Sequence, residues 1–212
     1  MGWTPGWKRA QAVDESRWVV LDVEASGLDA ARDSLLAIAS VAVRVDWPSR
    51  SLAIDLGDSF EAVLRQEQPS SRDNILLHGI GVARQSGGLP AREALQAFAV
   101  HAGASPLLAF HAAFDHTLVQ RHAKAALGAG LPQPWLDIEH LCGVTHPEVG
   151  ARSLDEWMDH FGIRCAARHQ AAADVLAESE LLLRIWPRVA AECGCWRDVQ
   201  RLAGRRRWIA RR

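Results

Sequence analysis

The sequence has no long uninterrupted apolar run. Crossing a bilayer takes about 20 consecutive apolar residues, and the segment from Ser34 to Val43, among the longest apolar stretches in the 212 residues, is far shorter. The amino-terminal Met1–Gly6 also lacks the apolar core of a signal peptide. We therefore expect a cytoplasmic protein without membrane contact.

Cysteine is scarce. The four residues, Cys142, Cys165, Cys193 and Cys195, are too few for a disulfide framework in a domain of this size. Cys193 and Cys195 flank a glycine, but no second pair has the spacing that would complete a zinc site. Reduced thiols are the expected state.

Net charge is close to zero but unevenly distributed. From Cys193 onward there are seven arginines and one aspartate, about +6, so the remainder carries about −7 within a total of −1. We expect an acidic domain over residues 1–192 and a basic extension over 193–212. A helix docked on the domain with a solvated basic face is favoured slightly over a phosphate-contacting extension. A membrane-surface helix is weaker, because Gly204 interrupts its pattern.

The chain contains no internal repeat, low-complexity segment or long linker. Its first part predicts strands over 17–24 and 34–44 and a third within 51–64, joined by short connections as in an antiparallel meander.

Helical patterns follow, interrupted by further strands. Strands first, and then strands alternating with helices, predict an α/β fold in which helices cover a mixed sheet. The expected helices span 71–77, 90–101, 114–127, a segment from Ser153 to Gly162, and 170–185 before Pro187; the expected strands span 106–110 and 136–142.

Two carboxylates stand inside the first strand. Asp22 and Glu24 are two residues apart, so their side chains share one face, while the neighbours Val19, Leu21 and Val23 favour burial. Adjacent anions in a core are costly unless a cation neutralises them, and oxygen ligands suit Mg²⁺ or Mn²⁺. An exposed edge strand with solvated acids is the alternative for this motif taken alone.

Two further acids are expected on inward helix faces. Asp115 lies in the first turn of a helix, where it could also simply complement the helix dipole. Asp174 shares a face with Ala171 and Leu181. His169, five residues before Asp174, would reach over it from the preceding loop, although a surface or capping histidine is the commoner case.

The order Asp22-x-Glu24, Asp115, His169-x4-Asp174 resembles the histidine subclass of the DEDD superfamily of 3′-to-5′ exonucleases. This family includes the proofreading epsilon subunit of bacterial DNA polymerase III and ribonuclease T. The resemblance covers roughly residues 17–185. It implies a ribonuclease H-like mixed sheet of three antiparallel strands and then two parallel ones, flanked by helices.

The resemblance also implies a two-metal mechanism with Mg²⁺ or Mn²⁺. In that mechanism Asp22 bridges both ions, Glu24 and Asp174 hold the ion that activates water, and Asp115 supports the other. His169 takes the proton of the water, which suits an imidazole of ordinary pKa about 6.5. The product would be a 5′-mononucleotide.

Substrate contacts implied by the resemblance lie in several segments. Two departures from the family pattern bear on substrate preference: Ala25-Ser26 replaces a Thr-Thr pair, and Phe110-His111 replaces His-Asn. Leu28 is expected to pack against the terminal base. The candidate substrate-binding residues are Ala25, Ser26, Gly27, Leu28, His78, His111 and Phe114.

Three functions remain open at the level of sequence. A single-stranded DNA 3′ end is the favoured substrate, with RNA as an alternative, because discrimination by 2′-hydroxyl contacts is not visible in the sequence. A non-catalytic nucleic-acid-binding protein on the same fold is a further candidate, disfavoured because buried acids are costly to retain without chemistry. An unrelated metal phosphatase is disfavoured by the ordered match. The oligomeric state is open, and a stand-alone enzyme, a homodimer and loose association with a polymerase are all considered.

Overall fold

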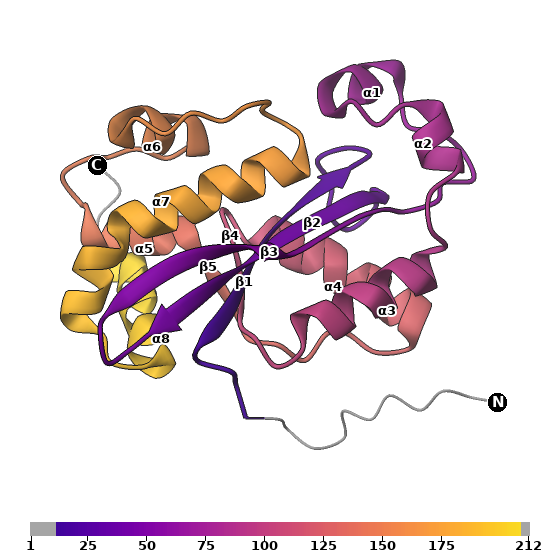
Figure 1. The fold of residues 1–212 in the computed structure, drawn as a ribbon. Helices are drawn as coiled ribbons and strands as arrows, with labels where there is room; N and C mark the ends of the chain where they lie inside the picture. Colours follow the sequence, from indigo (N-terminus) through magenta and orange to yellow (C-terminus); the bar gives the residue numbers. More distant parts are fainter. Residues whose placement is uncertain (1–11, 209–212) are drawn as a thin grey trace.

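The structure is a computed structural model that describes residues 12–208. A five-stranded mixed sheet forms the centre of the molecule (Figure 1). The strand order is β3-β2-β1-β4-β5; β3, β2 and β1 pair antiparallel, and β1, β4 and β5 pair parallel. This arrangement confirms the predicted sheet. The strands are β1 (Arg17–Ala25), β2 (Leu35–Asp46), β3 (Ser51–Val63), β4 (Leu107–Ala109) and β5 (Trp135–Asp137).

Helices cover both faces of the sheet (Figure 1): α7 crosses one face, and α3 and α4 lie on the other, while α1 and α2 project beyond the sheet. None of the described helices is long and apolar enough to cross a membrane. The helices are α1 (Arg72–His78), α2 (Val82–Ser86), α3 (Ala91–Ala102), α4 (Ala113–Leu127), α5 (Ile138–Thr145), α6 (Leu154–Phe161), α7 (Ala171–Glu192) and α8 (Trp196–Gly204), followed by a 3-10 turn, Arg205–Trp208.

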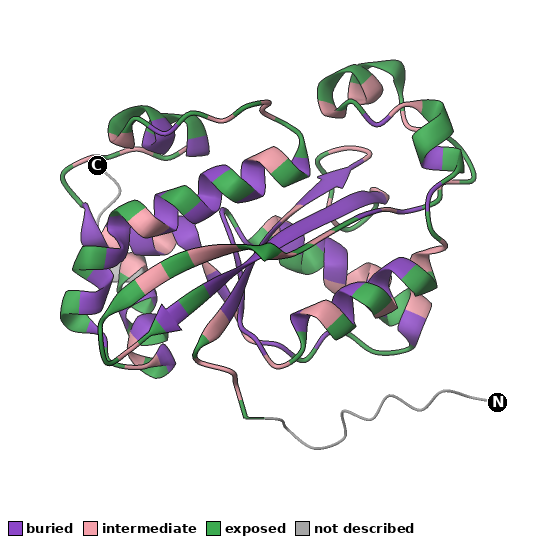
Figure 2. Cartoon of the chain, viewed as in Figure 1, coloured by how far each residue is buried: buried purple, intermediate pink, exposed green. Residues whose placement is uncertain are grey.

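The central strand β1 is buried on both faces (Figure 2). Trp18 and Val20 belong to the core cluster that includes α7, whereas Val19 and Leu21 belong to the cluster that includes α3 and α4. Because side chains alternate along a strand, Asp22 continues the face of Trp18 and Val20. The strand therefore delivers its carboxylates to the α7 side of the sheet.

Two expected boundaries were wrong. The strand expected over 136–142 ends at Asp137, because the Asp137 side chain accepts the Glu139 backbone N–H at 2.9 Å and caps α5. Helix α7 continues through Pro187 to Glu192. A proline removes one helical hydrogen bond, but Trp186 and Val189 on either side of it are buried in the core, which holds the helix together.

Helix α8 packs against the domain through Trp196, Val199 and Leu202, all buried. Two of the basic residues that follow pair with domain acids: Arg205 with Glu192 and Arg206 with Glu139, each at 2.6 Å. The division between residues 192 and 193 stays a prediction. Ile209, Arg211 and Arg212 of the basic extension lie outside the described residues.

Candidate active site

A pocket of about 330 Å³ lies where β1 and β4 end beside the first turns of α7. Carboxylates and imidazoles dominate its lining. The lining residues are Asp22, Val23, Glu24, His78, Phe110, His111, Ser153, Leu154, Asp155, Arg168, His169, Asp174 and Glu178.

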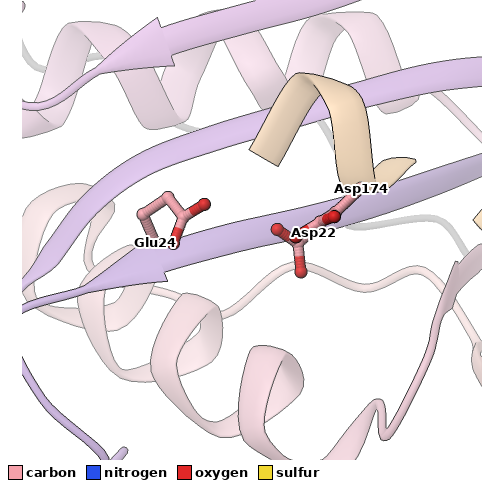
Figure 3. Close-up of side chains that lie close together, drawn as sticks. All are labelled: Asp22, Glu24 and Asp174. Atoms are coloured by element: carbon pink, nitrogen blue, oxygen red, sulfur yellow. The ribbon is translucent and has the colours of Figure 1, made fainter. Parts of the chain in front are cut away.

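Three of the predicted acids meet in this pocket (Figure 3). Asp22, Glu24 and Asp174 each offer a carboxylate oxygen, and these oxygens lie within 4.8 Å of one another. Asp22 and Glu24 reach the cluster from one face of β1, and Asp174 reaches it from the start of α7. The exposed edge strand considered from sequence is excluded, since β1 is the central strand and Glu24 is buried.

Burial and mutual repulsion disfavour ionisation of Asp22, Glu24 and Asp115. The pKa of Asp22 is raised well above its ordinary value by burial and then by the charges of Asp115 and Glu24. Burial also raises the pKa of Glu24, against the opposing hydrogen bond of His78. Asp115 is buried on α4, and burial raises its pKa to about 7. A bound cation would reverse this balance by favouring the charged forms.

The donor set fits a hard divalent cation. Among the described residues, Glu24 Oε1 is a buried atom without a hydrogen-bond partner, and leaving such an atom unsatisfied is costly. Carboxylate oxygens in close proximity suit Mg²⁺ or Mn²⁺. The Cys165 thiol also contacts this set, with Sγ 3.5 Å from Asp174 Oδ1.

His169 lies in the loop before α7, where the sequence placed it. Its backbone has a φ of 62°, in the left-handed region, and its N–H donates to Asp174 Oδ2 at 2.9 Å. This bond fixes His169 relative to Asp174 while the imidazole stays exposed at the pocket. The ring is therefore accessible to solvent.

His78, at the last residue of α1, forms an ion pair with Glu24. Burial would lower the pKa of His78, but the hydrogen bond and charge of Glu24 outweigh it and raise that pKa. The Asn74 side-chain amide donates to the Ala25 carbonyl at 2.7 Å. Both contacts fasten the projecting α1 to the end of β1.

The segment after β1 combines a tight turn with one exposed apolar residue. Ser26 is already engaged: its N–H donates to the Ser34 carbonyl at 2.9 Å, and its hydroxyl donates to Asp33 Oδ1 at 3.0 Å. A Cβ on Gly27 would lie 2.6 Å from Asp33 Oδ2, so a larger residue there would displace the Asp33 carboxylate. Leu28 is 96% exposed, free to meet a ligand.

His111 and Phe114 follow β4. His111 adopts a φ of 58°, its N–H donates to Asp137 Oδ1 at 3.0 Å, and its exposed side chain lines the pocket. Asp137 Oδ1 thus accepts backbone N–H groups from both His111 and Glu139. Phe114 is half-buried, packed against the α3–α4 core outside the pocket lining.

A family model decides which group of proteins this chain belongs to. The model for the RNase T family, described as exonuclease, matches residues 19–182. The chain belongs to the RNase T exonuclease family. The predicted resemblance to 3′-to-5′ exonucleases is therefore confirmed at the level of the family.

Relatives within the exonuclease family are distant and longer. A DNA polymerase III subunit epsilon-like protein of Rhodobacter capsulatus is 28% identical over 182 residues, which cover 84% of this chain and 25% of that protein. A PolC-type DNA polymerase III of Bacillus subtilis is 28% identical over 174 residues, covering 82% and 12%. The chain thus spans a quarter or less of these two relatives.

Solved structures share the fold. A structure of exonuclease I superposes with a TM-score of 0.65 at 14% identity, covering 84% of this chain and 44% of that one. A complex of E. coli exonuclease I with a dA16 oligonucleotide gives 0.66 at 13% identity, covering 84% and 44%. The ribonuclease H-like fold expected for an exonuclease is confirmed.

Sequence reasoning missed three charged pocket residues of this exonuclease domain: Asp155, Arg168 and Glu178. Glu178 lies one helical turn after Asp174, is 2% exposed, and accepts the Phe110 N–H at 3.1 Å. Burial and then the charge of Asp22 raise its pKa well above the ordinary value. Its four-residue spacing from Asp174 could have revealed it. Arg168 gave no such signal, because its loop position is set by tertiary contacts.

Proposed function

We propose that this chain is a metal-dependent 3′-to-5′ exonuclease that releases 5′-mononucleotides from single-stranded DNA. The observation that carries the proposal is the carboxylate cluster of Asp22, Glu24 and Asp174, with oxygens within 4.8 Å, beside the exposed His169. Membership of the exonuclease family supports it.

The acids would hold two divalent cations, Mg²⁺ or Mn²⁺. Asp22, Glu24 and Asp174 would bind one ion, and Asp115, whose charge acts directly on Asp22, would support a second ion together with Asp22. When bound, such ions supply Lewis-acid charge that polarises the phosphodiester and eases deprotonation of water.

Side chains of the protein would carry out proton transfer and substrate positioning. His169 would accept the proton of the attacking water as that oxygen bonds to phosphorus. The bond from phosphorus to the 3′-oxygen breaks, and the 3′-oxygen leaves on the shortened strand, taking a proton from solvent. Leu28 would pack against the terminal base, and His111 would contact the same nucleotide.

The preference for DNA and the partners are supported by the similar proteins. Exonuclease I has been solved with dT13 and dA16 oligonucleotides, and the relatives are named as DNA polymerase III components. We extend single-stranded DNA binding to this chain, with a loose polymerase association or a homodimer as its assembly. A cytoplasmic location is part of the proposal, in keeping with four free cysteines.

The test is a time course on 5′-labelled single-stranded DNA and RNA of one sequence, with Mg²⁺ or Mn²⁺. Asp22→Asn is the control, because it keeps the side-chain shape and removes the charge. We expect a DNA ladder that shortens from the 3′ end and is absent in the control.

Two other outcomes would change the proposal. A faster RNA ladder would keep the exonuclease and assign it to RNA. Absence of any ladder with either ion would contradict catalysis and favour a nucleic-acid-binding protein on this fold, in which the Phe110-His111 and Ala25-Ser26 departures would be examined first.

A further inference from the structure

Arg168 brings a positive charge into the acidic pocket. It lies in the loop between α6 and α7, directly before His169, and its side chain is 27% exposed. Nε donates to Asp155 Oδ1 at 2.6 Å, and Nη1 donates to Asp174 Oδ1. The guanidinium therefore spans from Asp155, in the first turn of α6, to Asp174 in the carboxylate cluster.

Three hydrogen-bond donors in the loop before α7 already approach the Asp174 carboxylate. Arg168 and the Cys165 thiol approach Oδ1, and the His169 N–H approaches Oδ2. The same carboxylate belongs to the cluster that fits a divalent cation. Two cations compete for one carboxylate because they repel each other at short range. A divalent ion on Asp174 would therefore displace the Nη1 end of Arg168.

Asp155 would keep the displaced guanidinium at the pocket. It holds the Nε side, independently of Asp174, and lies in a helix turn fixed by the capping box of Ser153 and Glu156. A side chain tethered at Nε can redirect its two Nη groups without leaving the site. Those groups would then face the space in which a ligand of the cations binds.

A phosphodiester is the anion that suits this arrangement. A guanidinium presents a planar fork of donors that matches phosphate oxygens. Among the pocket-lining residues of the described chain, Arg168 is the one lysine or arginine, amid Asp22, Glu24 and Asp174. An entering nucleic-acid phosphate thus meets a single permanently positive side chain there.

We propose that Arg168 is a catalytic residue that donates hydrogen bonds to a non-bridging oxygen of the scissile phosphodiester, with Asp155 as its positioning residue. This inference rests on the proposed function. Negative charge gathers on the phosphate oxygens as water attacks, and a preplaced donor stabilises that charge more than it stabilises the bound substrate.

The experiment compares Arg168→Ala, Arg168→Lys and Asp155→Asn with the wild-type chain. Arg164→Ala is the matched control, since Arg164 is an exposed arginine of the same loop outside the pocket lining. Three readouts are needed: kcat and KM on labelled single-stranded DNA with Mn²⁺, the rise in Tm caused by Mn²⁺, and the further rise caused by thymidine 5′-monophosphate.

For Arg168→Ala we expect kcat to fall about 10²-fold, as for removal of a single charge-stabilising donor. Its response to Mn²⁺ should stay at least as strong as that of the wild type, because Asp174 loses a competitor. Its response to thymidine monophosphate should weaken. Arg168→Lys should recover part of kcat, Asp155→Asn should lower kcat less than Arg168→Ala, and Arg164→Ala should match the wild type.

The inference is overturned if Arg168→Ala keeps kcat and nucleotide binding while Mn²⁺ binds more tightly, because Arg168 would then only neutralise Asp174. Failure of the proposed function has a different signature: the wild-type chain itself releases no nucleotide. In that case, loss of thymidine monophosphate binding in Arg168→Ala would still support the phosphate contact, and unchanged binding would overturn it.

Discussion

The face of β1 beneath α7 changes character along its length. At its start, Trp18 packs against Trp47, Trp186 and Trp196, with ring centroids 5.1–6.0 Å apart. The indole N–H of Trp18 donates to the Glu15 carbonyl and that of Trp186 to the Arg50 carbonyl. This tryptophan end is apolar, and these polar atoms are satisfied.

At the other end of the same face lie Asp22 and Glu24, with Asp174 and Glu178 of α7 above them. This acidic end holds acids whose pKa values are raised, at Asp22, Glu24 and Glu178, and an unpartnered Glu24 oxygen. One strand and one helix thus place stabilising packing and a destabilised, chemically useful site side by side. Buried acids with raised pKa values and unpartnered polar atoms cluster at functional sites.

Asp22→Asn and Asp174→Asn should show the largest difference between the acidic end and the tryptophan end. Each should lower the rate of 3′-end degradation on the order of 10³-fold or more, as loss of a group that acts as part of a catalytic unit does in other enzymes. The Tm of Asp22→Asn without metal should hold or rise, because a costly buried acid is gone. Rates on labelled DNA and thermal unfolding in a chelator check both expectations. Full activity in either variant would contradict the site assignment.

Trp18→Ala addresses the opposite end. Emptying a fully buried tryptophan site should destabilise the protein by about 3–5 kcal/mol. The kcat of the folded fraction at low temperature should change little, since Trp18 lies outside the pocket lining. Urea unfolding gives the stability, and a rate measured well below the new Tm gives the activity. A selective loss of kcat would show that the two ends are not separable.

The pH dependence of stability should also follow the acidic end. Asp115 has a pKa of about 7 against an ordinary 3.8, so the folded state binds the proton more tightly than the unfolded state. Its stabilising contribution is complete below about pH 4 and is lost as the pH rises through about 7. The Tm of metal-free protein should therefore fall more steeply over this window in the wild type than in Asp115→Asn. Identical slopes would contradict the raised pKa.

Glu178→Gln should have a smaller effect. Glutamine keeps an acceptor for the Phe110 N–H and removes a buried acid beside Asp22. We expect the metal-free Tm to rise by about 2–4 °C, the equivalent of roughly 1 kcal/mol in a chain of this size, and Mn²⁺ affinity to fall a little. A lower Tm with unchanged Mn²⁺ affinity would make Glu178 only a packing residue. Calorimetry with and without Mn²⁺ distinguishes these results.

Arg206→Ala should have the smallest effect. It removes the ion pair with Glu139 and should destabilise the chain by about 1 kcal/mol or less. The KM for single-stranded DNA should stay unchanged if this part of the basic extension serves only to dock it. A raised KM that is sensitive to salt would instead favour the phosphate-contacting extension.

Local chemistry explains what could be predicted from sequence. The alternation of strands placed Asp22 and Glu24 on one buried face, and helical spacing placed Asp174 inward. The family resemblance supplied the grouping of Asp115 and His169 with them. The boundary at Asp137 was missed because a side-chain cap, invisible to hydrophobic periodicity, starts α5 there.

Contacts between distant segments could not be predicted. His78 reaches Glu24 because α1 folds back onto the end of β1, and Arg168 reaches Asp155 because α6 lies beside the loop before α7. Neither pair has a spacing signal, since each joins elements brought together only by tertiary packing. Pro187 led to the opposite error, because helix propensity predicts that a helix ends before a proline. In the structure, tertiary packing lets α7 continue through Pro187 to Glu192.

Titration calorimetry of Mn²⁺ into the metal-free protein tests the central claim most directly. If the acidic end of β1 is a metal site, the wild-type chain should bind two ions, and Asp22→Asn should lose that binding while Trp18→Ala keeps it below its Tm. Absence of binding to the wild type, or equal binding to Asp22→Asn, would contradict the account.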